Sequence, residues 1–333
     1  MAKIAVLGAG GWGTALAVTL AQDHDVTLWS LFEQEIADIR ARGENTALLP
    51  GVPIGNHITL TSDISCAHAA DLILMATPSF AVRETAARLR SVVKEHAIIV
   101  NLSKGIEYET LSLFSDVILQ ELPTAKVVIL SGPSHAEEVS RGMPTTLVAT
   151  STDQNAAMLV QDLVMNDTLR VYTNDDITGV QLAGALKNII AIASGCVHGL
   201  GLGDNTTAAL ITRGLTEIAR LGKKMGAHES TFAGLTGVGD LIVTCTSQHS
   251  RNRQFGQLLG EGSSVPDALA KVGKTVEGYH AAKAAWALSK RERVEMPITE
   301  QCCHVMYEGK SARDAITALM ARPKKHEVEN PWL

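Results

Sequence analysis

The stretch Lys3-Ile-Ala-Val-Leu-Gly8-Ala-Gly10-Gly-Trp-Gly13 decides the fold of the first half of the chain. A short apolar run leads into the spacing Gly-x-Gly-x-x-Gly, and a helix-like run follows. In this setting Gly8 allows a tight turn, Gly10 lets the backbone approach a pyrophosphate, and Gly13 lets the helix lie close to the strand. The phosphates would rest on N–H groups at the positive end of the helix. The stretch predicts a dinucleotide-binding domain; the alternative is a glycine-rich turn without a ligand.

Strand and helix patterns alternate outward from this turn. Helices are expected at 14–21 and 33–42, and strands at 3–7, 25–29, 71–76, 97–101, 126–130 and 144–150. The run 71–76 is almost unbroken in its apolar character, as expected of a strand covered on both faces. Such alternation predicts an α/β fold with a Rossmann-type, doubly wound and mostly parallel sheet.

Beyond residue 175 the strand patterns end and helical patterns take over. Helices are expected at 176–199, 205–226, 251–260, 277–291, 297–308 and 312–321, the last starting at a capping arrangement, Ser311-Ala-Arg-Asp314. We therefore expect a dinucleotide-binding domain at 1–174, an all-helical substrate-binding domain at 175–324 and a flexible tail at 325–333.

Composition narrows the class of protein. A chain of 333 residues with 46% hydrophobic residues suits two domains with large cores. A net charge of −6 and the lack of a long basic run argue against a nucleic-acid binder. The five cysteines have no CxxC spacing, which favours reduced thiols in the cytoplasm, and the scattered histidines predict no metal site.

Membrane insertion and export are not expected. The most apolar stretch, 182–197, is too short to span a bilayer and carries Lys187-Asn188 at its middle. The first strand begins at residue 3, so no signal peptide precedes it. The sequence therefore predicts a cytoplasmic protein.

Lys187 is the clearest candidate for chemistry in the second half. It is the only formally charged residue between Asp176 and Asp204, on a helix otherwise rich in small and aliphatic residues. A lysine seldom lies in such a helix without a partner. We interpret it as a proton donor or acceptor tuned by burial and a nearby carboxylate. The alternative is a lysine whose head reaches solvent.

Asp240 is the candidate carboxylate. In Thr236-Gly-Val-Gly-Asp240 the glycines indicate a tight turn that delivers the side chain to a cleft, whereas an ordinary helix cap is the alternative. Ten residues later, Ser250-Arg251-Asn252-Arg253 combines a hydroxyl, two guanidiniums and an amide at a helix start. These groups suit a phosphate, although surface arginines at helix starts are common.

Two segments of the first half carry further candidates. In Ser131-Gly132-Pro-Ser134-His-Ala136-Glu137, Ser134 and Glu137 have the spacing of a capping box, which predicts a helix start near the ligand. Lys104 follows the strand expected at 97–101, where parallel sheets place ligand contacts.

Together these segments closely resemble the bacterial NAD(P)-dependent glycerol-3-phosphate dehydrogenases. The matching motifs run in order along nearly the whole chain: residues 8–15, 103–105, 131–134, 179–182, 186–188, 237–240, 250–253 and 276–278. The resemblance implies a Rossmann domain before an all-helical domain, NAD or NADP as cofactor, and a homodimer. It implies reduction of dihydroxyacetone phosphate to sn-glycerol 3-phosphate, which supplies phospholipid synthesis.

The resemblance also implies residue roles. Lys187 would be the general acid/base, Asp240 would orient and charge-balance it, and Lys104 would act on the substrate beside the nicotinamide. The substrate contacts implied, besides these three, are Gly132, Ser134, Ser250, Arg251 and Asn252. The cofactor contacts implied are Gly8, Gly10, Gly11, Trp12, Gly13, Lys104, Ala136, Arg251, Thr275 and Glu277.

Two positions depart from the family pattern. Gly11 stands where the family often has serine. Glycine keeps the backbone contact of that position but lacks the serine hydroxyl. At the end of the second strand, Trp29-Ser30-Leu31-Phe32 places no charge before Glu33. An acidic residue there would favour NAD and a basic one NADP, so this run indicates neither preference.

Two other functions remain open from the residues alone. The first is a two-domain dehydrogenase acting on a hydroxy acid. Its substrate would carry a carboxylate, whereas the segment around Arg251 suits a substrate with a phosphate. The second is a regulator that senses NAD(P) without chemistry. Burying Lys187 and Asp240 argues against this regulator, because such groups are costly to bury without a catalytic role.

Overall fold

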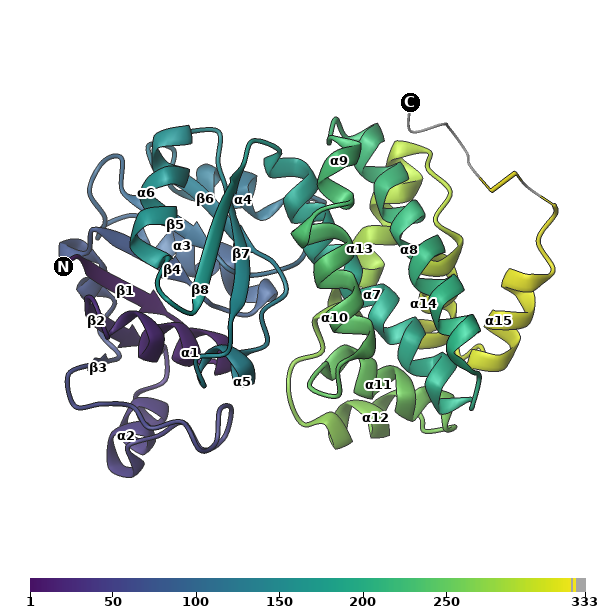
Figure 1. Ribbon diagram of the computed structural model, residues 1–333, viewed down its shortest axis with the longest axis horizontal. Helices are drawn as coiled ribbons and strands as arrows, with labels where there is room; N and C mark the ends of the chain where they lie inside the picture. Colours follow the sequence, from purple (N-terminus) through teal and green to yellow (C-terminus); the bar gives the residue numbers. More distant parts are fainter. Residues whose placement is uncertain (325, 328–333) are drawn as a thin grey trace. The chain divides into compact units, whose positions relative to one another are not determined.

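The computed structural model describes residues 1–324, 326 and 327, and it divides into two compact units (Figure 1). Unit 1 comprises residues 1–107 and 112–181; unit 2 comprises 108–111 and the chain from residue 182 onward. Unit 1 extends past the expected boundary at 174 because the Gln181 side chain accepts a hydrogen bond from Ser115 N and donates one to Ser115 Oγ, both at 2.9 Å. Apart from residues 326 and 327, the tail expected at 325–333 lies outside the described residues.

Unit 1 is built on one sheet of eight strands in the described chain, ordered β3-β2-β1-β4-β5-β6-β7-β8 (Figure 1). Paired neighbours are parallel, except β6 and β7, which are antiparallel. The strands are β1 (Lys3–Leu7), β2 (Asp25–Trp29), β3 (Thr59–Thr61), β4 (Leu72–Met75), β5 (Ile98–Asn101), β6 (Lys126–Ser131), β7 (Thr145–Thr150) and β8 (Leu169–Asn174). The predicted mostly parallel sheet is confirmed.

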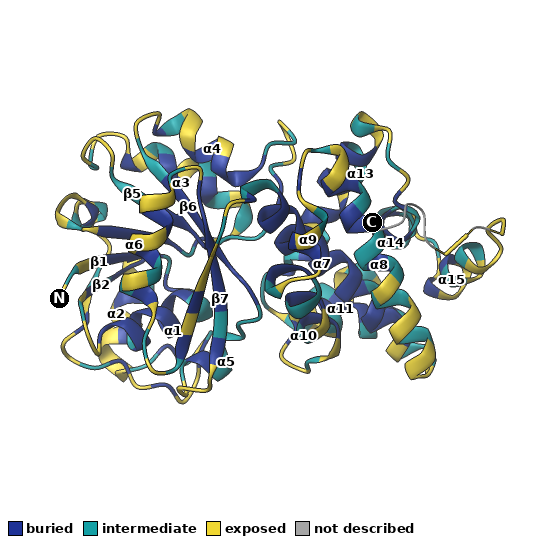
Figure 2. Ribbon diagram, turned by 45° about the horizontal axis from the view of Figure 1, so that its top comes forward, coloured by how far each residue is buried: buried dark blue, intermediate teal, exposed yellow. Residues whose placement is uncertain are grey.

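Both faces of this sheet are covered. Ile4 and Val6 of β1 share one apolar core with Leu16 and Val160, which lie on helices, while Ala5 points to the other face and is equally buried. Figure 2 shows the strands largely in the colour of buried residues. The α-helices of this unit are α1 (Gly11–Leu20), α2 (Glu33–Arg42), α3 (Val82–Leu89), α4 (Phe114–Glu121), α5 (Ala136–Val139) and α6 (Gln154–Val164), and α7 (Ile177–Gly199) begins here.

Two strands escape the sequence patterns. β3 has only three residues and lies at one edge of the sheet. β8 lies at the other edge, where Leu169 and Val171 are buried while Arg170 and Tyr172 are exposed. An edge strand with only two inward apolar positions has too weak a period to separate it from a loop.

Unit 2 is helical, and its longer helices agree with the sequence patterns within a few residues. After α7 come α8 (Asp204–Lys224), α9 (Glu229–Phe232), the π-helical turn η3 (Leu235–Gly239), α10 (Asp240–Thr246), α11 (Arg251–Gly260), α12 (Val265–Val272), α13 (Glu277–Glu292), α14 (Pro297–Tyr307) and α15 (Ala312–Met320). Ser311 caps α15 as predicted, because its hydroxyl accepts a hydrogen bond from Asp314 N at 3.0 Å. The short α9, α10 and α12 escaped the patterns.

α7 combines the length and hydropathy of a membrane-spanning helix with burial inside the protein. Among the described residues it is the one helix long and apolar enough to cross a membrane, and 94% of its most apolar stretch of 18 residues is buried. In Figure 2 it is coloured almost entirely as buried. Such burial is typical of the core helix of a soluble protein.

The five cysteines are all free thiols, and four of them are buried. Cys302 and Cys303 are sequence neighbours but donate to different carbonyls, those of Ile189 and Ala282. Burial raises the pKa of the Cys302 thiol well above its ordinary value and that of the Cys303 thiol to about 12, so both stay protonated near neutral pH. The adjacent pair therefore lacks the thiolate that redox chemistry requires.

Glu217 of α8 is a buried carboxylate that caps another helix. Its oxygens accept hydrogen bonds from Ile298 N at 2.8 Å, Thr299 N at 2.9 Å and Thr299 Oγ1 at 2.6 Å. These donors belong to the first turn of α14, where a negative charge also suits the helix dipole. Burial raises the pKa of the Glu217 carboxyl, and the three hydrogen bonds oppose that shift.

We expect Glu217→Gln to destabilise unit 2. The amide turns an N–H group toward donors that need an acceptor, which costs roughly 2 kcal/mol for a buried unsatisfied group. Calorimetric unfolding should show a clearly lower midpoint temperature. Glu308→Gln, at the exposed C-terminal end of α14, serves as the control and should leave the midpoint temperature nearly unchanged. Equal midpoints for both variants would contradict the capping role.

Candidate active site

The glycine turn is tightly packed at Gly8 and Gly13 and open at Gly10. Gly8 has φ +119°, and a Cβ there would lie 2.7 Å from the Ala76 carbonyl oxygen. A Cβ on Gly13 would lie 2.0 Å from the Gly8 carbonyl oxygen, which shows how closely α1 packs on β1. At Gly10 a Cβ would meet nothing described within 4 Å. Gly10 is also the N-cap of α1, whose first turn has no acidic residue. The turn thus offers open space and a positive helix end to an anion.

A buried asparagine supports this turn and escaped the sequence reasoning. Asn45 Nδ2 donates to the Ala9 carbonyl at 2.7 Å and to Thr14 Oγ1 at 3.1 Å. Its Oδ1 accepts from Leu48 N at 3.1 Å. Asn45 therefore joins the loop after α2 to the turn, a long-range contact that no local pattern shows.

Trp12 and Ala136, both expected at the cofactor, lie in one apolar cluster around Ala15 and Leu49. Gly11 belongs to the same place, since a Cβ added there would lie 3.8 Å from the Ala136 Cβ. The structure therefore brings these three predicted cofactor contacts together beside the glycine turn.

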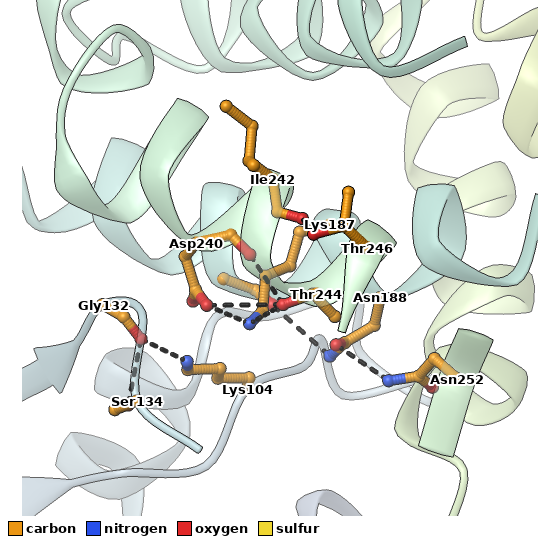
Figure 3. Close-up of polar contacts among 11 residues, drawn as sticks. Lys104, Gly132, Ser134, Lys187, Asn188, Asp240, Ile242, Thr244, Thr246 and Asn252 are labelled. Atoms are coloured by element: carbon orange, nitrogen blue, oxygen red, sulfur yellow. Dashed lines mark hydrogen bonds and ion pairs between the residues drawn. The ribbon is translucent and has the colours of Figure 1, made fainter. Parts of the chain in front are cut away.

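Lys104, Gly132 and Ser134 also meet within unit 1. Lys104 Nζ donates to the Gly132 carbonyl at 3.2 Å, and Ser134 Oγ donates to the same oxygen at 3.0 Å (Figure 3). The predicted capping box is wrong. The N-cap of α5 is His135, not Ser134, and no side chain makes a capping bond there. The Ser134 hydroxyl instead donates to the Gly132 carbonyl oxygen.

Lys187 and Asp240 form a buried ion pair in unit 2 (Figure 3). Lys187 is 6% exposed and Asp240 1%, so the alternative of a lysine reaching solvent is wrong. Lys187 Nζ contacts Asp240 Oδ1 and donates to Thr244 Oγ1 at 2.7 Å. Thr244 Oγ1 in turn donates to the Asp240 carbonyl oxygen at 2.6 Å. The Thr244 hydroxyl therefore hydrogen-bonds to both Lys187 and Asp240 and helps to hold them in place.

The π-helical turn η3 places Asp240 for this contact. A Cβ on Gly237 would lie 2.0 Å from the Phe232 carbonyl oxygen, so the chain needs glycine there. π-turns often mark functional sites. Asp240 is the first residue of α10, and its carboxylate reaches Lys187 rather than capping the helix. Thr244 was missed, although its spacing of four residues from Asp240 on a helix indicates a shared face.

In the predicted phosphate segment, residues 250–253, hydrogen bonds anchor the side chains of Ser250 and Asn252, while Arg251 is exposed and Arg253 is half-buried. Ser250 Oγ caps α11 by accepting from Arg253 N at 3.2 Å. Asn252 donates to Asn188 Oδ1 at 3.0 Å (Figure 3). It also accepts from Gly278 N at 2.8 Å. The asparagine contacts join α7, α11 and the start of α13, which carries Glu277. Of the two arginines in the segment, Arg251 is the more exposed.

The structure thus groups the expected residues within each unit. Unit 1 gathers the glycine turn with Trp12 and Ala136, and separately Lys104 with Gly132 and Ser134. Unit 2 gathers the Lys187–Asp240 pair, and it holds Thr275 and Glu277, both expected at the cofactor, at the start of α13. Across residues 1–324, 326 and 327 no group of three His, Cys, Asp or Glu side chains is placed to hold a metal ion.

Comparisons with known proteins identify the family. The N-terminal model of NAD-dependent glycerol-3-phosphate dehydrogenase matches residues 3–157, and the C-terminal model of the same family matches 176–317. The chain belongs to the NAD-dependent glycerol-3-phosphate dehydrogenase family. The resemblance expected from its motifs is confirmed.

Relatives match this glycerol-3-phosphate dehydrogenase family member along its whole length. A Bacillus pumilus protein named glycerol-3-phosphate dehydrogenase with NAD(P)+ is 52% identical, covering 99% of this chain and 97% of that protein. A Moorella thermoacetica protein of the same name is 51% identical, covering 98% of each. The crystal structure of glycerol-3-phosphate dehydrogenase from Coxiella burnetii superposes with a TM-score of 0.93 at 37% identity, covering 96% of this chain and 99% of that one.

Proposed function

We propose that Lys187 is the general acid/base of this dehydrogenase and that Asp240 and Thr244 position it. Family membership makes the chain an NAD(P)-dependent oxidoreductase that reduces dihydroxyacetone phosphate to glycerol 3-phosphate. The observation that supports the role of Lys187 is its burial in an apolar helix, where the Asp240 carboxylate and the Thr244 hydroxyl contact its ammonium group. The hydroxy-acid dehydrogenase and the cofactor sensor are excluded by the family.

The cofactor would be held by unit 1. The open space at Gly10, the positive φ of Gly8 and the start of α1 fit the pyrophosphate of NAD or NADP. Trp12 and Ala136 would lie beside it, with Lys104 near the nicotinamide. The resemblance to the family implies further cofactor contacts for Arg251, Thr275 and Glu277. When bound, the reduced cofactor supplies hydride to C2 of the substrate.

Lys187 would move the proton that the reaction requires. As C2 of dihydroxyacetone phosphate accepts hydride, its carbonyl oxygen gains negative charge, and the Lys187 ammonium donates a proton to that oxygen. Asp240 stabilises the ammonium before transfer, since a buried cation without a partner would lose its proton. In the reverse direction neutral Lys187 takes the proton from the C2 hydroxyl. Lys104 and Ser134, held at the Gly132 carbonyl, would contact the substrate.

The substrate phosphate would be held at the start of α11. Arg251 offers a guanidinium there, the helix end adds its dipole, and the Ser250 hydroxyl can still donate after accepting from Arg253 N. Asn252 has side-chain partners in Asn188 and Gly278, so it would shape the segment as well as contact the substrate.

We expect Arg251→Ala to raise the KM for dihydroxyacetone phosphate by roughly tenfold to a hundredfold, the effect of losing a charged hydrogen bond. The KM for unphosphorylated dihydroxyacetone should change far less, because it offers no phosphate. Initial rates at saturating cofactor measure both constants. Arg291→Ala, on the surface near the end of α13, removes the same charge and should alter neither. Equal changes for the two substrates would show that Arg251 does not recognise the phosphate.

The product would serve the synthesis of phospholipids in the cytoplasm. The apolar α7 is buried as a core helix, which supports a location away from the bilayer.

We also propose a homodimer, on the resemblance to the family. Light scattering on the purified chain should give twice the mass of 35.4 kDa. A single species at the monomer mass would refute the dimer.

A further inference from the structure

The end of β2 lies directly against the glycine turn. Gly8 N donates to the Trp29 carbonyl oxygen at 2.9 Å, so the first glycine of the motif is bonded to the last residue of β2. Ser30 is the next residue and is buried. In a parallel sheet, ligands bind at the carboxyl ends of the strands, and the residue at this end of β2 meets the adenosine ribose. Ser30 occupies that place.

A carboxylate reaches this place from α2. The Ser30 hydroxyl donates to Glu35 Oε2, and it accepts from Phe32 N at 3.2 Å. Glu35 lies in the first turn of α2, whose start at Glu33 follows the sharp change of direction after β2. The acidic group that the sequence lacks at residue 30 is therefore supplied five positions later by the fold.

No cationic side chain stands close to Ser30 and Glu35 along the chain. Residues 26–39 include no Lys, Arg or His. The nearest arginines after that run have other partners: Arg40 donates to the Leu60 carbonyl at 2.8 Å, and Arg42 donates to Thr46 Oγ1 at 2.6 Å. Leu31 and Phe32 are 44% and 66% exposed, which leaves apolar side chains beside Ser30 where an adenine ring could pack.

We infer that Glu35, held by Ser30, selects the nucleotide without a 2′-phosphate, so that this chain uses NADH in preference to NADPH. The inference rests on the proposed cofactor site. A ribose 2′-hydroxyl can donate to the Glu35 carboxylate, whereas a 2′-phosphate brings about two negative charges to the same carboxylate, and residues 26–39 offer no cation to balance them. Glu35 is a specificity residue that sequence inspection of β2 alone does not show.

Dissociation constants for NADH and NADPH, measured by titration calorimetry, test this inference without turnover. The wild-type chain should bind NADH roughly tenfold or more tightly than NADPH, as expected for juxtaposed like charges. Glu35→Gln should narrow this ratio, chiefly by tightening NADPH. Glu33→Gln removes the same charge from the same helical turn without a contact to Ser30, and it should keep the wild-type ratio.

Two results would overturn the inference: wild-type affinity for NADPH equal to or above that for NADH, or an unchanged ratio in folded Glu35→Gln. If that variant does not fold, the wild-type ratio alone decides. Assays with dihydroxyacetone phosphate and each nucleotide separate this outcome from the proposed function. Selective NADH binding together with near-normal turnover by Lys187→Met would refute the catalytic proposal alone, whereas equal binding and equal rates with both nucleotides would refute only the selectivity.

Discussion

Lys187→Met is expected to lower kcat for reduction of dihydroxyacetone phosphate by roughly a thousandfold, within the range for loss of a general acid. Methionine keeps the length and apolar stem of the side chain and removes its proton. The developing charge on the substrate oxygen then has no donor at the position of Nζ. Stopped-flow or steady-state oxidation of the reduced cofactor measures the loss.

The loss of kcat in Lys187→Met reports on proton transfer only if the variant still binds the nucleotide. The glycine turn, Trp12 and Ala136 belong to unit 1, and the substitution touches none of them. The dissociation constant for the reduced nucleotide should therefore stay near the wild-type value. Lys224→Met, at the exposed end of α8, is the matched control and should keep full activity. Loss of nucleotide binding together with activity would indicate misfolding instead.

Asp240→Asn is expected to impair both stability and turnover. Lys187 would remain in an apolar site without its carboxylate, and breaking a buried ion pair on one side costs roughly 3 kcal/mol. The unpaired lysine would also lose its proton more readily, so kcat in the reducing direction should fall by about a hundredfold. Urea unfolding and steady-state rates measure the two effects.

The double variant Lys187→Met/Asp240→Asn separates stability from catalysis. With both charges removed, the free energy of unfolding should recover part of the loss, giving a coupling of roughly 2 kcal/mol between the sites. Activity should stay as low as in Lys187→Met alone. Strictly additive losses of stability would contradict the ion pair, and recovery of activity would contradict the catalytic role of the lysine.

The fold was largely predictable because its signals are local. The glycine turn, the apolar runs of the inner strands and the long amphipathic helices each show in a few consecutive residues. The edge strands β3 and β8 and the short helices α9, α10 and α12 were missed, since each has too few inward positions to establish a period. Ser134 shows the opposite failure: its spacing to Glu137 was suitable for a cap, but Gly132 offered a competing acceptor.

The site was predictable in its residue types but less so in its partners. Lys187 is visible as a lone charge in an apolar helix, and Asp240 as a carboxylate after glycines. That they touch is a contact across 53 positions of sequence, which spacing alone cannot give. Asn45 is beyond local patterns for the same reason, since its bond to Ala9 spans 36 positions. Glu35 is only five positions from Ser30, but its contact depends on the turn between β2 and α2 and not on a residue at the end of the strand.

The most direct test of the catalytic account is the rate of NADH oxidation with dihydroxyacetone phosphate, measured for the wild-type chain and Lys187→Met at saturating cofactor and substrate. The account predicts one glycerol 3-phosphate formed per NADH by the wild type, and a variant that binds NADH normally but turns over about a thousandfold more slowly. A variant that keeps near-normal kcat would contradict the account, because proton transfer would then not depend on Lys187.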